Sequence, residues 1–93
     1  MNKKKLKIAR NKVDQLDQNI FNLIKKRTQA VKYMLSLKKF KKEIVDHKRN
    51  NEILKKIRNK SIKNGIDPKI TIRIWKSIIG SYIDFQKRNF KKK

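Results

Sequence analysis

The fold is decided by residues 6–37, which read LKIARNKVDQLDQNIFNLIKKRTQAVKYMLSL. Apolar side chains recur there at alternating steps of three and four residues, and the stretch contains neither glycine nor proline. This spacing places the apolar side chains along one stripe of an α-helix. The stripe comprises Leu6, Ala9, Val13, Leu16, Ile20, Leu23, Ala30, Met34 and Leu37. The pattern predicts one long amphipathic helix from about Lys4 to Lys39.

Such a helix is about 54 Å long at 1.5 Å per residue, roughly twice the ~26 Å expected for the width of a small domain. Its far end therefore needs another subunit to pack on. A domain of 93 residues also has a marginal core of its own. We expect a homo-oligomer.

The rest of the chain predicts two shorter helices. Phe40 to Val45 interrupts the apolar periodicity, and Asp46 suits the N-cap of a second helix that ends near Ile62. Asn64-Gly65 is a helix stop signal, and Asp67-Pro68 places a capping carboxylate before a proline suited to a first helical turn. The predicted apolar face of the third helix comprises Ile70, Ile74, Trp75, Ile78, Ile79, Ile83 and Phe85.

The composition limits the class of protein. The chain has no cysteine, which excludes disulfide frameworks, cysteine-ligated metals and thiol nucleophiles. Its one histidine, His47, cannot form a histidine metal site alone. We expect one all-α domain over residues 1–93, with basic tails at about 1–5 and 89–93; the basic run of the C-terminus starts at Lys87. No long apolar run is present, so a soluble, cytoplasmic protein with no membrane partner is expected.

The net charge of +22 points in principle to nucleic acid or an anionic surface. The basic residues are, however, scattered over the whole chain and are mostly lysine, which favours a solvated surface. No zinc-finger spacing or recognition helix accompanies them, so no specific nucleic-acid partner is predicted. A basic helical module that binds a polyanion remains an alternative to an enzyme.

Three cations of the long helix are candidates for a binding site. Arg27 and Lys38 are eleven residues apart, which places them on one stripe about 16 Å apart. Arg10 is seventeen residues before Arg27, about 25 Å away, too far to share a small site within one chain. Arginine presents a planar fork that suits a carboxylate, and lysine supplies most of this chain's positive charge. The arginines are therefore candidates for carboxylate recognition.

Polar residues interrupt the apolar faces of the two shorter helices. Asp46, Arg49 and Asn50 share a face of the second helix, and Tyr82 and Gln86 share a face of the third. A buried polar side chain is costly without a partner, so these interruptions indicate a polar cavity between helices. A solvent-exposed position at a helix edge is the alternative for Gln86.

One set of residues, spread over about 6–88, is Ala9-Arg10, Val13-Asp14-x-Leu16-Asp17, Leu23-Ile24-x-x-Arg27, Val31-Lys32, Lys38, Ile44-x-Asp46-x-x-Arg49 and Gln86. Together these residues resemble the all-helical class of chorismate mutase, the type II family. Their helix lengths, breaks and spacings agree with the family as well as their identities.

The resemblance implies an intertwined homodimer of three-helix chains with two shared, cofactor-free active sites that bind a small-molecule substrate. The implied reaction is the rearrangement of chorismate to prephenate, part of aromatic amino-acid biosynthesis. Arg27 of one chain and Arg10 of the partner subunit would bind the two carboxylates. Lys38 and Gln86 would hydrogen-bond the ether oxygen. Arg49 and Asp46 would line the side of the ring hydroxyl.

Two positions depart from the mutase pattern. Asn50 stands where a glutamate that binds the ring hydroxyl is usual, and Tyr82 stands where a serine is common. Tyr82-Ile83-x-x-Gln86 with Val31-Lys32 resembles the related isochorismate-pyruvate lyases, which make salicylate and pyruvate on the same scaffold. Asp46 and the approach Ile44-Val45-Asp46 to Arg49 look more like the mutases. Chorismate mutase is the primary hypothesis and the lyase is the alternative.

Overall fold

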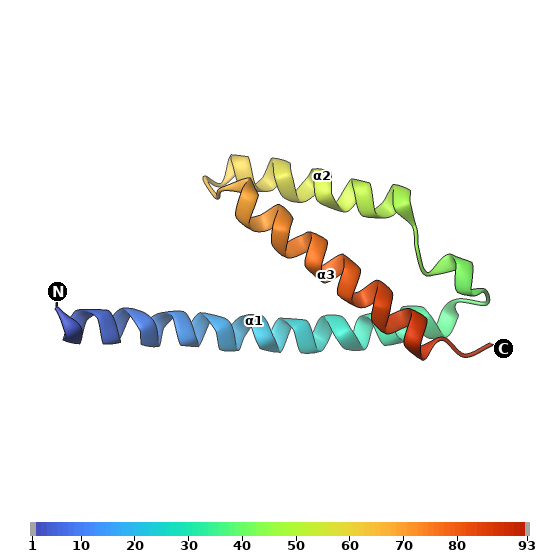
Figure 1. The fold of residues 1–93 in the computed structure, drawn as a ribbon, viewed down its shortest axis with the longest axis horizontal. Helices are drawn as coiled ribbons and strands as arrows, with labels where there is room; N and C mark the ends of the chain where they lie inside the picture. Colours follow the sequence, from blue (N-terminus) through green and yellow to red (C-terminus); the bar gives the residue numbers. More distant parts are fainter. Residues whose placement is uncertain (1, 93) are drawn as a thin grey trace. The chain divides into compact units, whose positions relative to one another are not determined.

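The computed structural model describes residues 2–92, which form three α-helices and a short 3-10 turn with no strand. In chain order the elements are α1 (Lys3–Leu37), η1 (Lys41–Glu43), α2 (His47–Lys63) and α3 (Pro68–Asn89), shown in Figure 1. This confirms the predicted all-α fold with one long and two shorter helices. The chain divides into two units, residues 1–31 and 32–93, and α1 runs through the boundary between them.

None of the helices within residues 2–92 is both long enough and apolar enough to span a bilayer.

Helix α1 begins with a cap that sequence reasoning missed. The Asn2 side-chain oxygen accepts a hydrogen bond from the Lys5 N–H at 3.1 Å, and the Asn2 carbonyl accepts one from Leu6 at 3.1 Å. This is the geometry of an N-cap residue. The cap starts the helix at Lys3, within the segment that the sequence assigns to a basic tail.

Within residues 2–31, α1 runs from Lys3 to the end of the unit, about 43 Å at 1.5 Å per residue, and the apolar stripe of this part is mostly exposed. Only Val31 is buried, with 7 % of its surface accessible. Leu6 is half-buried, and the accessible fraction of the exposed large apolar side chains runs from 40 % at Ile24 to 64 % at Leu23. The exposed set is Ile8, Val13, Leu16, Ile20, Phe21, Leu23 and Ile24. The predicted stripe is present, and nothing in this unit covers it.

Helix α2 starts and stops where the sequence predicts. The Asp46 carboxylate accepts a hydrogen bond from the Arg49 N–H at 3.0 Å, which makes Asp46 the N-cap. At the other end, the Gly65 N–H donates to the Ile62 carbonyl and the Ile66 N–H donates to Ser61. This pair of bonds is a Schellman motif, which needs a residue with positive φ, and Gly65 has φ 69°.

Helix α3 begins directly after this turn. The Asp67 carboxylate accepts a hydrogen bond from the Lys69 N–H at 2.9 Å, and Pro68 is the first helical residue. The helix continues to Asn89, so Lys87 and Arg88 lie in its last turn and not in a tail. Cations are favourable there because the C-terminal end of a helix carries partial negative charge.

Helices α2 and α3 pack side by side as an antiparallel hairpin (Figure 1). Ile53, Leu54 and Ile57 of α2 are half-buried, and so are Trp75 and Ile78 of α3. A hydroxyl pair links the two helices, because Ser61 Oγ and Thr71 Oγ1 are 2.6 Å apart. Ser61 Oγ also lies 2.6 Å from the Ile57 carbonyl, its acceptor, so Thr71 is the donor within the pair.

The apolar face of α3 differs in part from the predicted one. Ile70 and Ile74 are 56 % and 47 % exposed. The buried side of α3 follows Thr71, Trp75 and Ile78, which recur at steps of four and three residues. At about 100° of rotation per residue, Ile70 lies roughly 110° and Ile74 roughly 70° around the helix from the centre of that side. The Asn64–Asp67 turn therefore presents Thr71, and not Ile70, to α2.

We expect Thr71→Val to destabilise the hairpin by about 1–2 kcal/mol, because it leaves the hydroxyl of Ser61, which is 4 % exposed, without its donor. Valine keeps the branched shape of threonine, so the loss measures the hydrogen bond and not a cavity. Urea denaturation followed by circular dichroism measures the change. Ser81→Ala, on the exposed side of the same helix, serves as the control. Equal midpoints for the two variants would contradict the role given to this hydroxyl pair.

Candidate functional site

Lys38 and Gln86 meet although they are 48 residues apart in the chain. Lys38 Nζ donates a hydrogen bond to Gln86 Oε1 at 2.8 Å. Lys38 follows the last residue of α1, and Gln86 lies in the last turns of α3. Gln86 is 7 % exposed and is the one buried residue of α3 among those described, while Lys38 is half-buried. The sequence alternative of a solvent-exposed Gln86 is therefore wrong.

The pair can still offer hydrogen bonds to a ligand. An ammonium group has three N–H donors and an amide group has two. One Lys38 donor is used on Gln86, and one Gln86 donor reaches the Tyr82 carbonyl at 3.2 Å. The remaining N–H donors are on Lys38 Nζ and Gln86 Nε2. The arrangement suits an oxygen atom that carries or develops negative charge.

The turn after Lys38 is held by Glu43, a residue that sequence reasoning missed. Glu43 Oε2 accepts hydrogen bonds from the Lys39 and Phe40 N–H groups, each at 2.7 Å. In return, the Glu43 N–H donates to the Phe40 carbonyl at 3.0 Å. The spacing of Phe40-x-x-Glu43 is that of a capping box, but a phenylalanine in the capping position hides the signal because that position normally carries serine or threonine.

Glu43 stays ionised because its contacts favour the charged form. The Phe40 N–H lowers the pKa of this carboxyl the most, and the Lys39 N–H and the charges of Lys38 and Lys42 act in the same direction. Partial loss of hydration acts in the opposite direction and is outweighed. The Lys42 ammonium also lies 5.6 Å from the centre of the Phe40 ring. The turn is thus a local cluster of one anion between cations and backbone donors.

Asp46, Arg49 and Asn50 occupy the first turn of α2 and the residue before it. Asp46 caps the helix through the Arg49 N–H, and its carbonyl accepts the Asn50 N–H at 2.9 Å. Asn50 is half-buried, whereas Asp46 and Arg49 are exposed. The Arg49 guanidinium is thus on the surface of the 32–93 unit, and Asp46 is the N-cap that the sequence predicts.

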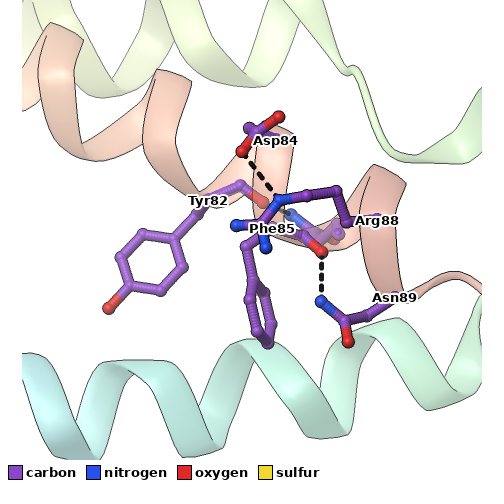
Figure 2. Close-up of polar contacts among 6 residues, drawn as sticks. Tyr82, Asp84, Phe85, Arg88 and Asn89 are labelled. Carbon is purple, nitrogen blue, oxygen red and sulfur yellow. Dashed lines mark hydrogen bonds and ion pairs between the residues drawn. The ribbon is translucent and has the colours of Figure 1, made fainter.

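Tyr82 lies one turn before Gln86 on α3. Its ring packs edge-on against Phe85, with ring centres 6.4 Å apart and planes at 81°. Figure 2 shows both rings leaving α3 on one side, while Asp84 points the other way and pairs with Arg88 at 2.9 Å. Asn89 closes the helix by donating to the Phe85 carbonyl at 2.8 Å. Tyr82 is half-buried and shares its side of the helix with Gln86.

Arg10 and Arg27 both lie on α1 within the 1–31 unit. Arg10 is exposed and Arg27 is half-buried. Because the helix is continuous from Lys3 to Leu37, the seventeen residues between them correspond to about 25 Å. The two guanidinium groups of one chain therefore cannot meet on one small ligand. The structure brings together Lys38, Gln86 and Tyr82, and it brings together Asp46, Arg49 and Asn50, but it does not bring Arg10 to Arg27.

The family model for chorismate mutase type II matches residues 9–87, which is most of the chain. Searches of curated proteins and of solved structures found no match. The matched range includes the whole of α2 and most of α1 and α3, and it ends one residue after Gln86. The chain belongs to the chorismate mutase type II family.

Proposed function

We propose that this chain is a chorismate mutase, which converts chorismate to prephenate without a covalent intermediate. The reaction breaks the ether C–O bond and forms a C–C bond within one molecule, so no proton has to be transferred. Negative charge develops on the ether oxygen as the C–O bond lengthens. The protein therefore has to hold the compact conformer and stabilise that oxygen.

The observation that carries this proposal is the hydrogen bond between Lys38 Nζ and Gln86 Oε1. It places an ammonium group and an amide group, one half-buried and one buried, at the same point of the 32–93 unit. Preorganised donors of this kind act on the oxygen at no cost of reorganisation during the reaction. In the proposed site, Lys38 and the Gln86 amide turn their remaining donors to the ether oxygen.

The other proposed contacts belong to the ends of the substrate. Arg27 of one chain and Arg10 of the partner subunit bind the carboxylates. Arg49 and Asp46 line the side of the ring hydroxyl. Asn50, half-buried on α2, provides an amide for that hydroxyl in place of the glutamate usual in the mutases. Tyr82 lines the wall beside Gln86. The proposal includes no cofactor and places the enzyme in the cytoplasm.

A homodimer is part of the same proposal, and two observations support it. The apolar stripe of residues 8–24 is exposed, which costs about 25 cal/mol for every Å² left in water. Within one chain, Arg10 and Arg27 lie about 25 Å apart along α1. A second copy that lies along α1 would cover the stripe and bring its own Arg10 to the site.

Incubation of the purified protein with chorismate and, separately, with isochorismate tests the reaction directly. We expect prephenate from chorismate, identified by chromatography. Salicylate and pyruvate from isochorismate alone would make the chain an isochorismate-pyruvate lyase, which the tyrosine at Tyr82 and the asparagine at Asn50 favour. No product from either substrate would refute the enzyme and favour a basic module that binds a polyanion.

Substitution of Lys38 tests the proposed ether-oxygen contact. We expect Lys38→Ala to lower kcat by about 10²–10³-fold, as the loss of one donor to a developing oxyanion does in other enzymes. Lys56→Ala removes an equal charge from the exposed side of α2 and should change kcat by less than about twofold. Chorismate consumption gives the rates, and circular dichroism checks the fold. Normal turnover in Lys38→Ala would remove this lysine from the site.

Mixing of two defective variants tests the shared site. Arg10→Ala and Arg27→Ala chains are each expected to lose most activity as homodimers. A mixed dimer has one intact site of two, and random pairing makes about half of the dimers mixed. An equal mixture after refolding should therefore regain about a quarter of the wild-type activity. Light scattering of the wild type should give the mass of two chains. Activity that stays at the average of the two variants would show that each site is built from one chain.

A further inference from the structure

The direction of Lys38 is not set by the helix that precedes it. Helix α1 ends at Leu37, and the Lys38 N–H reaches the Leu35 carbonyl three residues back, at 3.1 Å. Lys39 and Phe40 form a bend, and Phe40 is already extended, with φ −125° and ψ 140°. The position of the Lys38 ammonium on Gln86 therefore depends on what fixes the backbone after Leu37.

Glu43 provides that restraint from the far side of the bend. One carboxylate oxygen binds the N–H groups of the two residues that directly follow Lys38. Glu43 directly precedes a buried residue, Ile44, which is 5 % exposed, and the Ile44 N–H closes the same turn by donating to the Lys41 carbonyl at 3.1 Å. The restraint thus runs from the buried Ile44, through the Glu43 carboxylate, to the two residues that follow Lys38.

A charged acceptor suits this task better than a neutral one. Hydrogen bonds from backbone amides to an ionised carboxylate are shorter and stronger than those to neutral acceptors, and both bonds are 2.7 Å long. The two N–H groups would otherwise point into water from a bend that has no ladder or helix to satisfy them. Removal of the carboxylate should free the bend and, with it, the base of the Lys38 side chain.

We propose that Glu43 is a positioning residue, which holds the bend at Lys39 and Phe40 so that the Lys38 ammonium stays on Gln86. Its effect on catalysis rests on the proposed function, but its effect on Lys38 does not. Glu43 does not touch the substrate in this proposal and acts only through Lys38.

The experiment compares Glu43→Ala and Glu43→Gln with Glu52→Ala, the matched control, which removes the chain's other glutamate from the exposed side of α2. We expect Glu43→Ala to lower kcat about tenfold with KM changed less than twofold, since a misplaced donor weakens transition-state stabilisation. Glu43→Gln retains an acceptor oxygen and should recover most of the rate. Glu52→Ala should behave as wild type.

A second readout does not depend on activity. The side-chain amide of Gln86 gives an NMR signal that Gln86→Ala identifies by its loss. In Glu43→Ala this signal should move toward the position that it takes in Lys38→Ala, and in Glu52→Ala it should not move. An unmoved Gln86 signal in Glu43→Ala would overturn the proposal, whatever the rates are. A moved signal in a protein that converts neither substrate would support the proposal while refuting the proposed function.

The double variant separates action through Lys38 from a direct effect of the Glu43 charge. In the Lys38→Ala background, Glu43→Ala should cause no further loss of kcat, because the group that it positions is gone. A further tenfold loss there would show that Glu43 acts on the substrate or on the fold by another route, and would overturn the proposal.

Discussion

The contact on which the rest of the site depends is the hydrogen bond between Lys38 and Gln86. A buried amide needs partners, and Gln86 takes one from the lysine that follows α1 and another from the Tyr82 carbonyl of its own helix. The bond fixes the end of α3 against the residues that follow α1, although 48 residues separate the two. The hairpin of α2 and α3 supplies the rigid support, and the bend at Lys39 and Phe40 sets the angle at which the lysine arrives.

Most of the fold could be predicted because its boundaries are encoded locally. Asp46, Gly65, Asp67 and Pro68 each act on their own neighbours, so the starts of α2 and α3 and the turn between them follow from the residue types. The identity of the side of α3 that faces α2 could not be predicted in full, since the turn geometry decides whether Ile70 or Thr71 points inward. The meeting of Lys38 with Gln86 came from a family pattern, because periodicity alone carries no information on contacts 48 residues apart. Glu43 was missed because its usual capping partner is replaced by Phe40.

Three of the seven acidic residues of this chain bind its own backbone. Asp46, Asp67 and Glu43 each accept backbone N–H groups, and Asp84 pairs with Arg88. Seven acidic residues face twenty-nine lysines and arginines, so the positive charge has few partners of opposite sign. Each cap serves a helix end as well as reducing the net charge. At 0.1 M salt the repulsion between exposed cations more than about 10 Å apart is largely screened, so we expect added salt to stabilise this fold.

The four-residue turn from Asn64 to Asp67 has a consequence for the order of folding. It joins two helices whose contacts are close in sequence, and chains with local contacts fold in microseconds to milliseconds. The hairpin can therefore assemble at a rate that does not depend on protein concentration. The exposed stripe of residues 8–24 can be covered in the proposed dimer only by collision with a second chain. Assembly of the complete enzyme would then be a bimolecular step that follows a unimolecular one, and dilution would slow the second alone.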